Sequence, residues 1–188
     1  MPSYQSLSGT PDRSEWHPFH LAYLGHLLPG LGTEMGHSDD AISFLEAQLR
    51  DLESFLGEVP AERETYRYAP GKWSLREVVG HLSDTERILS FRALAAARGD
   101  VSLILPFDED AYAAASGHDV LPLHRLGLDL LAVRRSTLSL LATFRHDDWR
   151  GRGNSGSHPV SARAWAFAIG AHAQLHLRTL RTRYLAEV

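Results

Sequence analysis

The sequence predicts an all-α protein, a four-helix bundle with long crossover loops, and three observations support this fold class. Four long segments carry apolar residues at spacings of three and four, the period of an amphipathic helix. No segment sustains the two-residue alternation that is typical of a strand. The chain has 188 residues, a length that suits one domain with a sizeable core. Four amphipathic helices in one domain favour a bundle.

The N-terminal region differs in composition from the rest of the chain. Polar residues interrupted by proline and glycine fill positions 1–15, which predicts a flexible tail before a single domain at 16–188. Short apolar pieces follow over 16–36, where proline and glycine are frequent. A short helix that ends near Leu28 is expected there.

Start and stop signals delimit the four long helices. Ser38 is the expected N-cap of the first helix and Gly57 its stop. The second helix begins at Ser74, and Glu77 three residues later completes a capping box. The second, third and fourth helices are expected over 74–98, 122–145 and 160–185.

The connection between the second and third helices is long for a bundle. It contains about 23 residues, and an extended chain of that length can travel along a whole neighbouring helix of roughly 35 Å. The two helices are therefore expected to run parallel. The connection mixes apolar and acidic residues, and long loops of this kind are often functional.

Composition excludes several classes of function. The net charge of −4 gives no reason to expect a nucleic-acid partner. The chain has no cysteine, so a transition metal would have to be held by histidine, aspartate or glutamate. The start of the chain has no signal-peptide pattern, and no apolar run reaches the roughly 18 residues of a membrane span. A cytoplasmic protein without a membrane partner is expected.

Two histidines stand four residues apart in the apolar part of the fourth helix. His172 and His176 fall on one helical stripe with Trp165, Ile169 and Leu180. A buried imidazole without a partner costs about 1–3 kcal/mol, so a partner is expected. Hydrogen bonds to neighbouring groups are one explanation. A metal ion is the other, because histidines at i and i+4 present two nitrogens on one side of a helix.

A metal site needs a third ligand, and the second helix supplies one. His81 lies near the edge of the apolar face of that helix. Glu77 and Asp84, one turn to either side, are expected to hydrogen-bond its second ring nitrogen and fix its tautomer. A zinc peptidase is excluded, because its His-Glu-x-x-His motif needs a glutamate where this chain has Ala173. The pattern favours a site of three histidines shared by two helices and facing the interior of the bundle.

Other polar residues have two interpretations each. Asp108 and Asp110, in "FDEDAY", either cap the segment that follows or belong to a loop that closes over the metal, where one acid orients water or substrate. Asp84 is a further candidate to support catalysis. Arg183 either lies on a solvated face or attracts an anionic thiol cofactor. The remaining eight histidines share no spacing, and most are expected at the surface.

Three blocks of the sequence, in order, resemble the DinB/YfiT-like superfamily. They are "YRYAPGKWSLREVVGHLSDTERILSFRALAAARGD" (66–100), "LPFDEDAYAAA" (105–115) and "HPVSARAWAFAIGAHAQLHLRTLRTRYL" (158–185). The resemblance extends from about residue 16 to 185. It implies a bundle of up-down-down-up connectivity and a divalent metal, commonly nickel or zinc, held by three histidines. The matching positions are His81, His172 and His176.

The resemblance also implies a class of reaction. Characterised relatives include thiol S-transferases that use bacillithiol or mycothiol, and a mycothiol-dependent isomerase. A cation held by three neutral ligands makes a thiol or a water easier to deprotonate. The resemblance therefore implies a metal-dependent enzyme acting on a small-molecule substrate, with thiol transfer slightly favoured over hydrolysis, and a homodimer. Because the chain has no cysteine, the thiol must arrive as a cosubstrate.

Two alternatives to an enzyme stay open. Many relatives carry a glutamate and a second histidine where this chain has Ala173 and Leu175, which leaves the three ligands intact but weakens the case for activity. The first alternative is a non-catalytic, metal-binding stress-response bundle, and the second is a metal-free bundle whose histidines form hydrogen bonds. An enzyme is expected to leave an open ligand position beside a pocket, whereas a purely structural site is expected to be closed.

Overall fold

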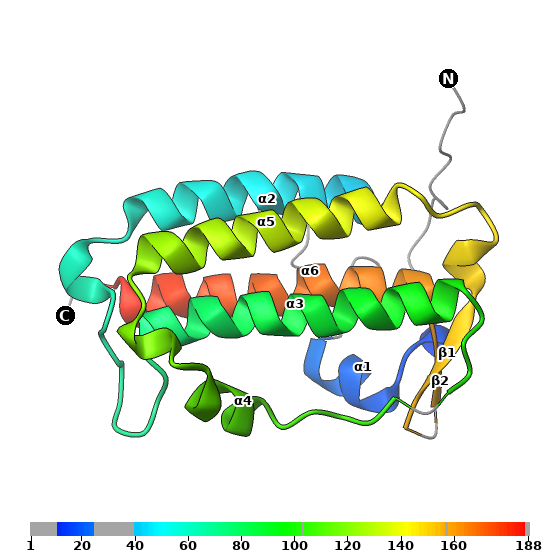
Figure 1. Ribbon diagram of the computed structural model, residues 1–188, viewed down its shortest axis with the longest axis horizontal. Coiled ribbons are helices and arrows are strands. Elements are labelled where there is room, and N and C mark those ends of the chain that lie inside the picture. Colours follow the sequence, from blue (N-terminus) through cyan, green and yellow to red (C-terminus); the bar gives the residue numbers. More distant parts are fainter. Residues whose placement is uncertain (1–10, 25–39, 103, 157, 187–188) are drawn as a thin grey trace.

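The computed structural model describes residues 11–24, 40–102, 104–156 and 158–186, and it confirms the predicted four-helix bundle (Figure 1). Its long helices are α2 (Ala41–Glu58), α3 (Leu75–Ala97), α5 (Leu123–Leu141) and α6 (Ala162–Thr179), and α6 continues as a π-helical turn over Leu180–Tyr184. Helices α2 and α6 run in one direction and α3 and α5 in the other, which is the up-down-down-up arrangement (Figure 1).

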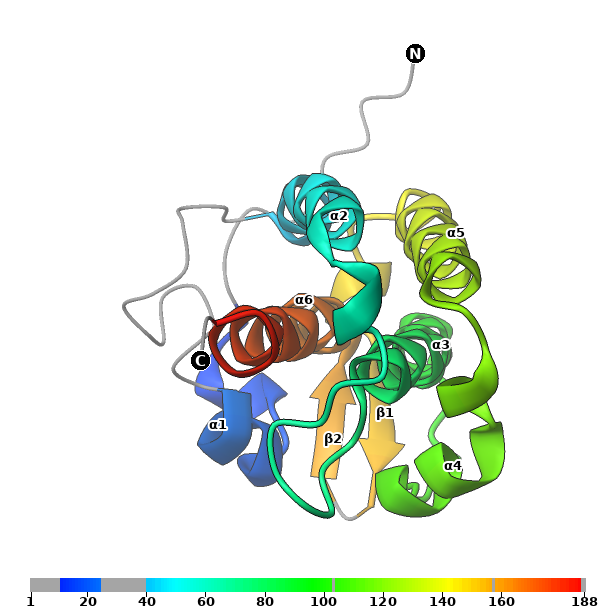
Figure 2. The ribbon, with the colours of Figure 1, turned by 90° about the vertical axis from the view of Figure 1, so that its left-hand side faces the viewer.

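The four helices form a square in which each packs on two neighbours. Helix α3 packs on α5 and α6, and α2 packs on the same two helices from the opposite side (Figure 2). Helices α3 and α5 are parallel neighbours, as the length of their connection predicts. That connection carries a short helix, α4 (Glu109–Ser116), where the sequence predicts a loop.

Side chains satisfy the first amide groups of the long helices. The predicted capping box of α3 is present, since the Ser74 hydroxyl accepts from the amide of Glu77 and the Glu77 carboxylate accepts from the amide of Ser74. The predicted cap Ser38 lies outside the described residues. Asp40 caps α2 instead, because its carboxylate accepts from the amides of Ile42 and Ser43.

A short antiparallel hairpin corrects the expectation that the chain has no strands. Strands β1 (Arg152–Ser155) and β2 (His158–Ser161) pair with Gly153 opposite Val160. Each strand is only four residues long, which is too short to show a sustained alternation in sequence. Gly156, after β1, has a φ of 60°, a left-handed conformation that glycine adopts without strain.

The N-terminal segment also departs from the sequence prediction. Residues 11–15 belong to the expected flexible tail, yet Glu15 is buried there and forms an ion pair with Arg163 at the start of α6. The rest of that tail, residues 1–10, is not described. Helix α1 (Pro18–Leu24) is the predicted short helix, and its expected end near Leu28 falls outside the described residues.

A buried ion pair and the amide beside it link the four long helices, and no sequence pattern predicted them. Arg134 of α5 has no exposed surface and donates to both carboxylate oxygens of Glu86 on α3, at 2.8 and 2.9 Å. It also donates to Gln48 of α2, whose amide donates in turn to the carbonyl of Gly170 on α6.

Within the described part of the chain, no helix combines the length and hydropathy of a membrane span.

Candidate metal centre

Three histidine rings from two helices meet at one point. His81 comes from α3, and His172 and His176 from successive turns of α6. Each offers one ring nitrogen, and these three nitrogens lie within 4.8 Å of one another. The Nε2 atoms of His81 and His172 are 3.1 Å apart. The structure thus brings together the three histidines that the sequence singled out.

The three rings form T-shaped pairs with one another. The ring centroid of His81 lies 5.0 Å from that of His172 and 5.0 Å from that of His176, and the two α6 rings are 4.5 Å apart. Their planes are inclined to one another by 60° to 66°. Ring nitrogens, which lie in the ring plane, can therefore point toward a common centre.

Burial keeps the three imidazoles neutral at physiological pH. Desolvation, with a smaller contribution from His176 and His118, lowers the pKa of His81 to about 3. Desolvation lowers the pKa of His176 to about 4. Burial first, and the neighbouring imidazoles second, lower the pKa of His172 well below its ordinary value. A neutral imidazole has a free lone pair, which is the form that binds a metal.

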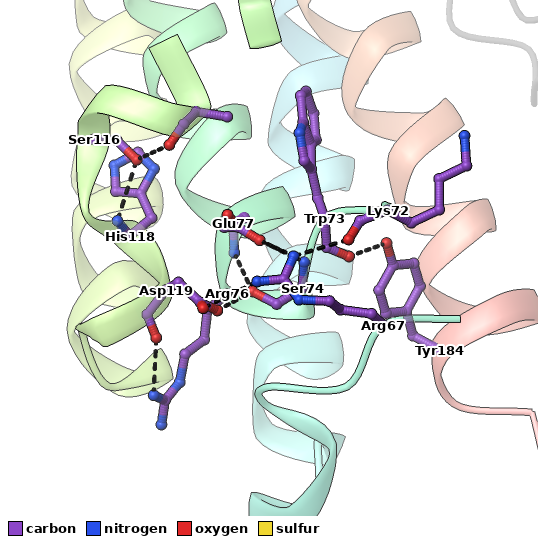
Figure 3. A network of polar contacts seen from close by, with 11 residues as sticks. Arg67, Lys72, Trp73, Ser74, Arg76, Glu77, Ser116, His118, Asp119 and Tyr184 are labelled. Carbon is purple, nitrogen blue, oxygen red and sulfur yellow. Dashed lines mark hydrogen bonds and ion pairs between the residues drawn. The ribbon is translucent and has the colours of Figure 1, made fainter. Parts of the chain in front are cut away.

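Thr85 and Trp73 hold the His81 ring. The Thr85 hydroxyl, one turn along α3, lies 3.4 Å from Nδ1 of His81, and Thr85 is buried. The indole of Trp73 packs on the same ring, with 4.7 Å between ring centroids. The Tyr184 hydroxyl donates to the backbone carbonyl of Trp73 at 2.8 Å and fixes that segment (Figure 3).

The structure gives Glu77 and Asp84 other partners than the expected His81. The Glu77 carboxylate accepts from Arg67 and from the amide of Ser74, within the polar network at the start of α3 (Figure 3). Asp84 faces His118, at 3.8 Å. Among the described residues of α3, Thr85 is the one whose side-chain hydroxyl lies beside His81. At 3.6 residues per turn, Asp84 lies about 60° around α3 from His81, on the side that faces His118, and Thr85 lies about 40° to the other side.

The histidines line a cavity of about 720 Å³. Helix α1, helix α3, helix α6, the connection before α4 and the hairpin turn all contribute to its wall. None of the described lining residues belongs to α2 or α5. The site therefore faces outward from the α3–α6 pair rather than into the centre of the bundle, where the sequence argument had placed it.

The two loop acids have different positions. Asp108 caps α4, because its carboxylate accepts from the amide of Ala111 at 3.0 Å. Asp110 lines the cavity beside Glu109, in the first turn of α4. Arg183 is exposed in the last turn of the C-terminal helix and is not part of the cavity wall among the described residues. Of the three, Asp110 has a position from which it can reach a ligand.

Three polar residues of the cavity were missed by the sequence argument. His17 and His20 belong to the eight histidines that were mostly expected at the surface, yet both line the cavity. Arg92 of α3 lines it as well and is only 6% exposed. The signal was present in the spacing, because His81, Thr85, Leu89 and Arg92 follow one face of α3 at intervals of three and four.

The donor set fits one divalent cation. Two imidazole nitrogens bound to a tetrahedral ion at about 2.0–2.1 Å lie roughly 3.3 Å apart, close to the separation seen between His81 and His172. A hydrogen bond between those two rings would explain the same contact. It would leave His176 unexplained, because its ring has no hydrogen bond within the described residues. Three protein ligands beside an open cavity are typical of catalytic rather than structural metal sites.

The fold and the site together define a class of protein, an up-down-down-up four-helix bundle with a three-histidine centre in the wall of a cavity. The family model of the DinB superfamily matches residues 45–180, and the chain belongs to that superfamily. The predicted resemblance is thereby confirmed.

A solved structure shares the fold. YfiT from Bacillus subtilis, described as a probable metal-dependent hydrolase with an unusual four-helix bundle topology, superposes with a TM-score of 0.68 at 17% sequence identity. The match covers 83% of this chain and 94% of YfiT. Among curated proteins, none matches this chain in sequence.

Proposed function

We propose that this chain is a metal-dependent enzyme that binds one divalent cation, nickel or zinc, and acts on a small molecule in the adjoining cavity. One observation carries the proposal, the meeting of three neutral imidazoles at the wall of a cavity of about 720 Å³. The description of YfiT as a probable metal-dependent hydrolase supports it.

Each residue of the site has a stated role. His81, His172 and His176 are the ligands, and Thr85 orients the first of them through its ring nitrogen. A bound cation would supply a Lewis acid that lowers the pKa of a nucleophile. Asp110 lines the cavity and is the acid we expect to orient the nucleophile or a polar group of the substrate.

Water is the first candidate for the nucleophile, and the reaction is then a hydrolysis. The description of YfiT favours this reaction. A low-molecular-weight thiol such as bacillithiol is the second candidate. Two features favour it, because the chain has no cysteine of its own and the cavity lies in the upper part of the roughly 300–1,000 Å³ range of small-molecule sites. There is room for a thiol cosubstrate beside an electrophile.

Elemental analysis tests the metal site. Purified wild type, His172→Ala and the matched control His124→Ala, which removes an exposed histidine of α5, are loaded with nickel or zinc and desalted. We expect about one equivalent in wild type and control and less than a tenth of that in His172→Ala. Equal metal in all three proteins, or none in wild type, would refute the site.

Turnover assays distinguish the reactions. The metal-loaded protein is offered a panel of esters and amides, and separately bacillithiol with a simple electrophile. Turnover without thiol identifies a hydrolase, and turnover that depends on thiol identifies a transferase. Full metal loading without either activity would support the non-catalytic metal-binding bundle. The homodimer and the cytoplasmic location stay predictions, and light scattering on the purified protein tests the first.

A further inference from the structure

Arg92 is a buried cation in the cavity wall without an anionic partner. Its side chain is 6% exposed, and among the described residues that line the cavity it is the one lysine or arginine. Its Nη2 donates to the carbonyl of Leu105 at 3.1 Å, and its guanidinium lies 5.1 Å from the ring centroid of Trp165. Its Nε is buried and has no hydrogen-bond partner in the described structure.

The other buried arginine, Arg134, shows what a structural role requires. Arg134 in the bundle core is held by two hydrogen bonds to the carboxylate of Glu86. Arg92 has no such carboxylate among the described residues, and burial without a compensating anion lowers its pKa. An unpaired buried charge is destabilising, and an anionic ligand would remove that cost.

A second unpartnered nitrogen belongs to a residue that packs on the same tryptophan as Arg92. Nδ1 of His20 is buried and has no partner in the described structure, and its ring packs on the indole of Trp165 with 4.9 Å between centroids. Trp165 therefore contacts both His20 and Arg92. Burial, and to a smaller extent the charges of His17 and Arg92, lower the pKa of His20 to about 4. At neutral pH the imidazole adds a polar group but no charge.

We infer that Arg92 and His20 form a carboxylate-binding subsite of the cavity, which anchors a small carboxylate-bearing substrate with its reacting group toward the three histidines. The inference rests on the proposed function for the reacting end and names the substrate class of the same site. One permanently charged cation matches a monoanion. The carboxylates of Glu109 and Asp110 also line the cavity, so a phosphate dianion would bring one more negative charge into it than a carboxylate does.

Helix α3 sets the length of such a substrate. Arg92 follows His81 by three turns on the same face, which separates their Cα atoms by roughly 16 Å along the helix axis. Thr85 and Leu89 line the cavity between them. The guanidinium and imidazole side chains shorten this span, so the subsite suits an elongated molecule with a carboxylate at one end and an apolar middle.

Ligand binding to the metal-free protein tests the subsite without any contribution from a cation at the histidines. Hexanoate and its uncharged analogue hexanamide are titrated into ¹⁵N-labelled, metal-stripped protein at pH 7.5 and followed by NMR. We expect wild type to bind hexanoate at least about tenfold more tightly than hexanamide, since a charge-assisted hydrogen bond contributes more than a neutral one. Inorganic phosphate forms a third arm and is expected to bind more weakly than hexanoate.

Three variants locate the binding. Arg92→Met keeps the length of the side chain and is expected to weaken hexanoate binding about 10- to 100-fold while leaving hexanamide unchanged. Arg92→Lys keeps the charge but loses the planar fork and is expected to lie between the two. The matched control is Arg87→Met on the same helix, which removes an arginine paired with Asp129 and is expected to bind like wild type.

The outcomes separate this inference from the proposed function. Equal affinities of wild type for hexanoate and hexanamide, or an Arg92→Met variant that keeps the preference, would overturn the subsite whatever the metal content. Tighter binding of phosphate than of hexanoate would contradict the substrate class. The metal content of Arg92→Met reports on its fold, and if that variant fails to fold, the comparison of hexanoate with hexanamide in wild type decides. Absence of metal from wild type would refute the metal centre and leave this measurement intact.

Discussion

Acid should destabilise the metal-free protein through its histidine cluster. The folded-state pKa is about 3 for His81 and about 4 for His176, against an ordinary value of 6.5. Below pH 6.5 the unfolded chain therefore binds protons that the folded protein does not, and the free energy of unfolding falls as the pH falls. The stability contributed by these neutral imidazoles is fully present above pH 6.5 and is lost progressively between pH 6.5 and about 3.

The size of the effect follows from the two pKa values. Each proton taken up by the unfolded state alone costs about 1.4 kcal/mol of stability per pH unit. Between pH 7.5 and pH 5 each of the two histidines therefore removes about 2 kcal/mol, and the pair removes about 4 kcal/mol. That is a large share of the roughly 5–15 kcal/mol that stabilises a typical domain.

Urea unfolding of the metal-stripped protein at pH 7.5, 6.5, 5.5 and 5.0 measures the effect. His176→Leu removes one of the titrating groups and should lose about 2 kcal/mol less than wild type between pH 7.5 and pH 5. His124→Gln removes an exposed histidine outside the cavity and is the matched control. Both variants keep the carboxylates that titrate in the same range, so those carboxylates contribute equally to the two measurements. If His176→Leu and His124→Gln show the same pH dependence, the cluster is not desolvated and the reasoning fails.

Three further predictions concern residues around the site and in the core. Arg134→Met leaves the carboxylate of Glu86 buried and unpaired, so it should reduce the free energy of unfolding by about 3–5 kcal/mol in urea at pH 7.5. Gly170→Ala places a methyl group 2.0 Å from the ring of Phe44 on α2, so it should lower the melting temperature by several degrees. A variant as stable as wild type would show that α2 and α6 separate easily. Thr85→Val removes the hydroxyl beside His81 and should weaken nickel or zinc binding about 10- to 100-fold, measured by competition with a chromophoric chelator. Unchanged affinity would show that the hydroxyl does not orient His81.

The helices and the histidine set could be predicted because they depend on local spacing. The positions of His172 and His176, one turn apart on α6, place two rings on one side of any regular helix. The capping box at Ser74 marks where α3 begins, and so places His81 inside a regular helix, in its second turn. The long connection before α5 was enough to predict that α3 and α5 run parallel.

The partners of those side chains could not be predicted, because they depend on which helix lies on which side. Helix α3 is buried over most of its circumference, so its apolar pattern does not tell the face toward the bundle core from the face toward the cavity. Asp84 and Thr85 are adjacent in sequence, yet only Thr85 lies beside His81. The surroundings of position 173 could not be predicted either. Ala173 packs in the apolar cluster around Leu177 rather than in the cavity wall.

Helix α3 divides its buried polar groups between two surroundings, and the difference argues for ligand binding in the cavity. On the face toward the bundle core, Glu86 has a complete ion pair with Arg134. On the face toward the cavity, Arg92 has one backbone carbonyl and a buried Nε without a partner in the described structure. Folded proteins pair most buried polar groups, and a chain that pairs one buried arginine completely has no stability reason to leave another unpaired. A charge left without an anion beside a three-histidine centre is therefore best explained by a partner that is not part of the chain.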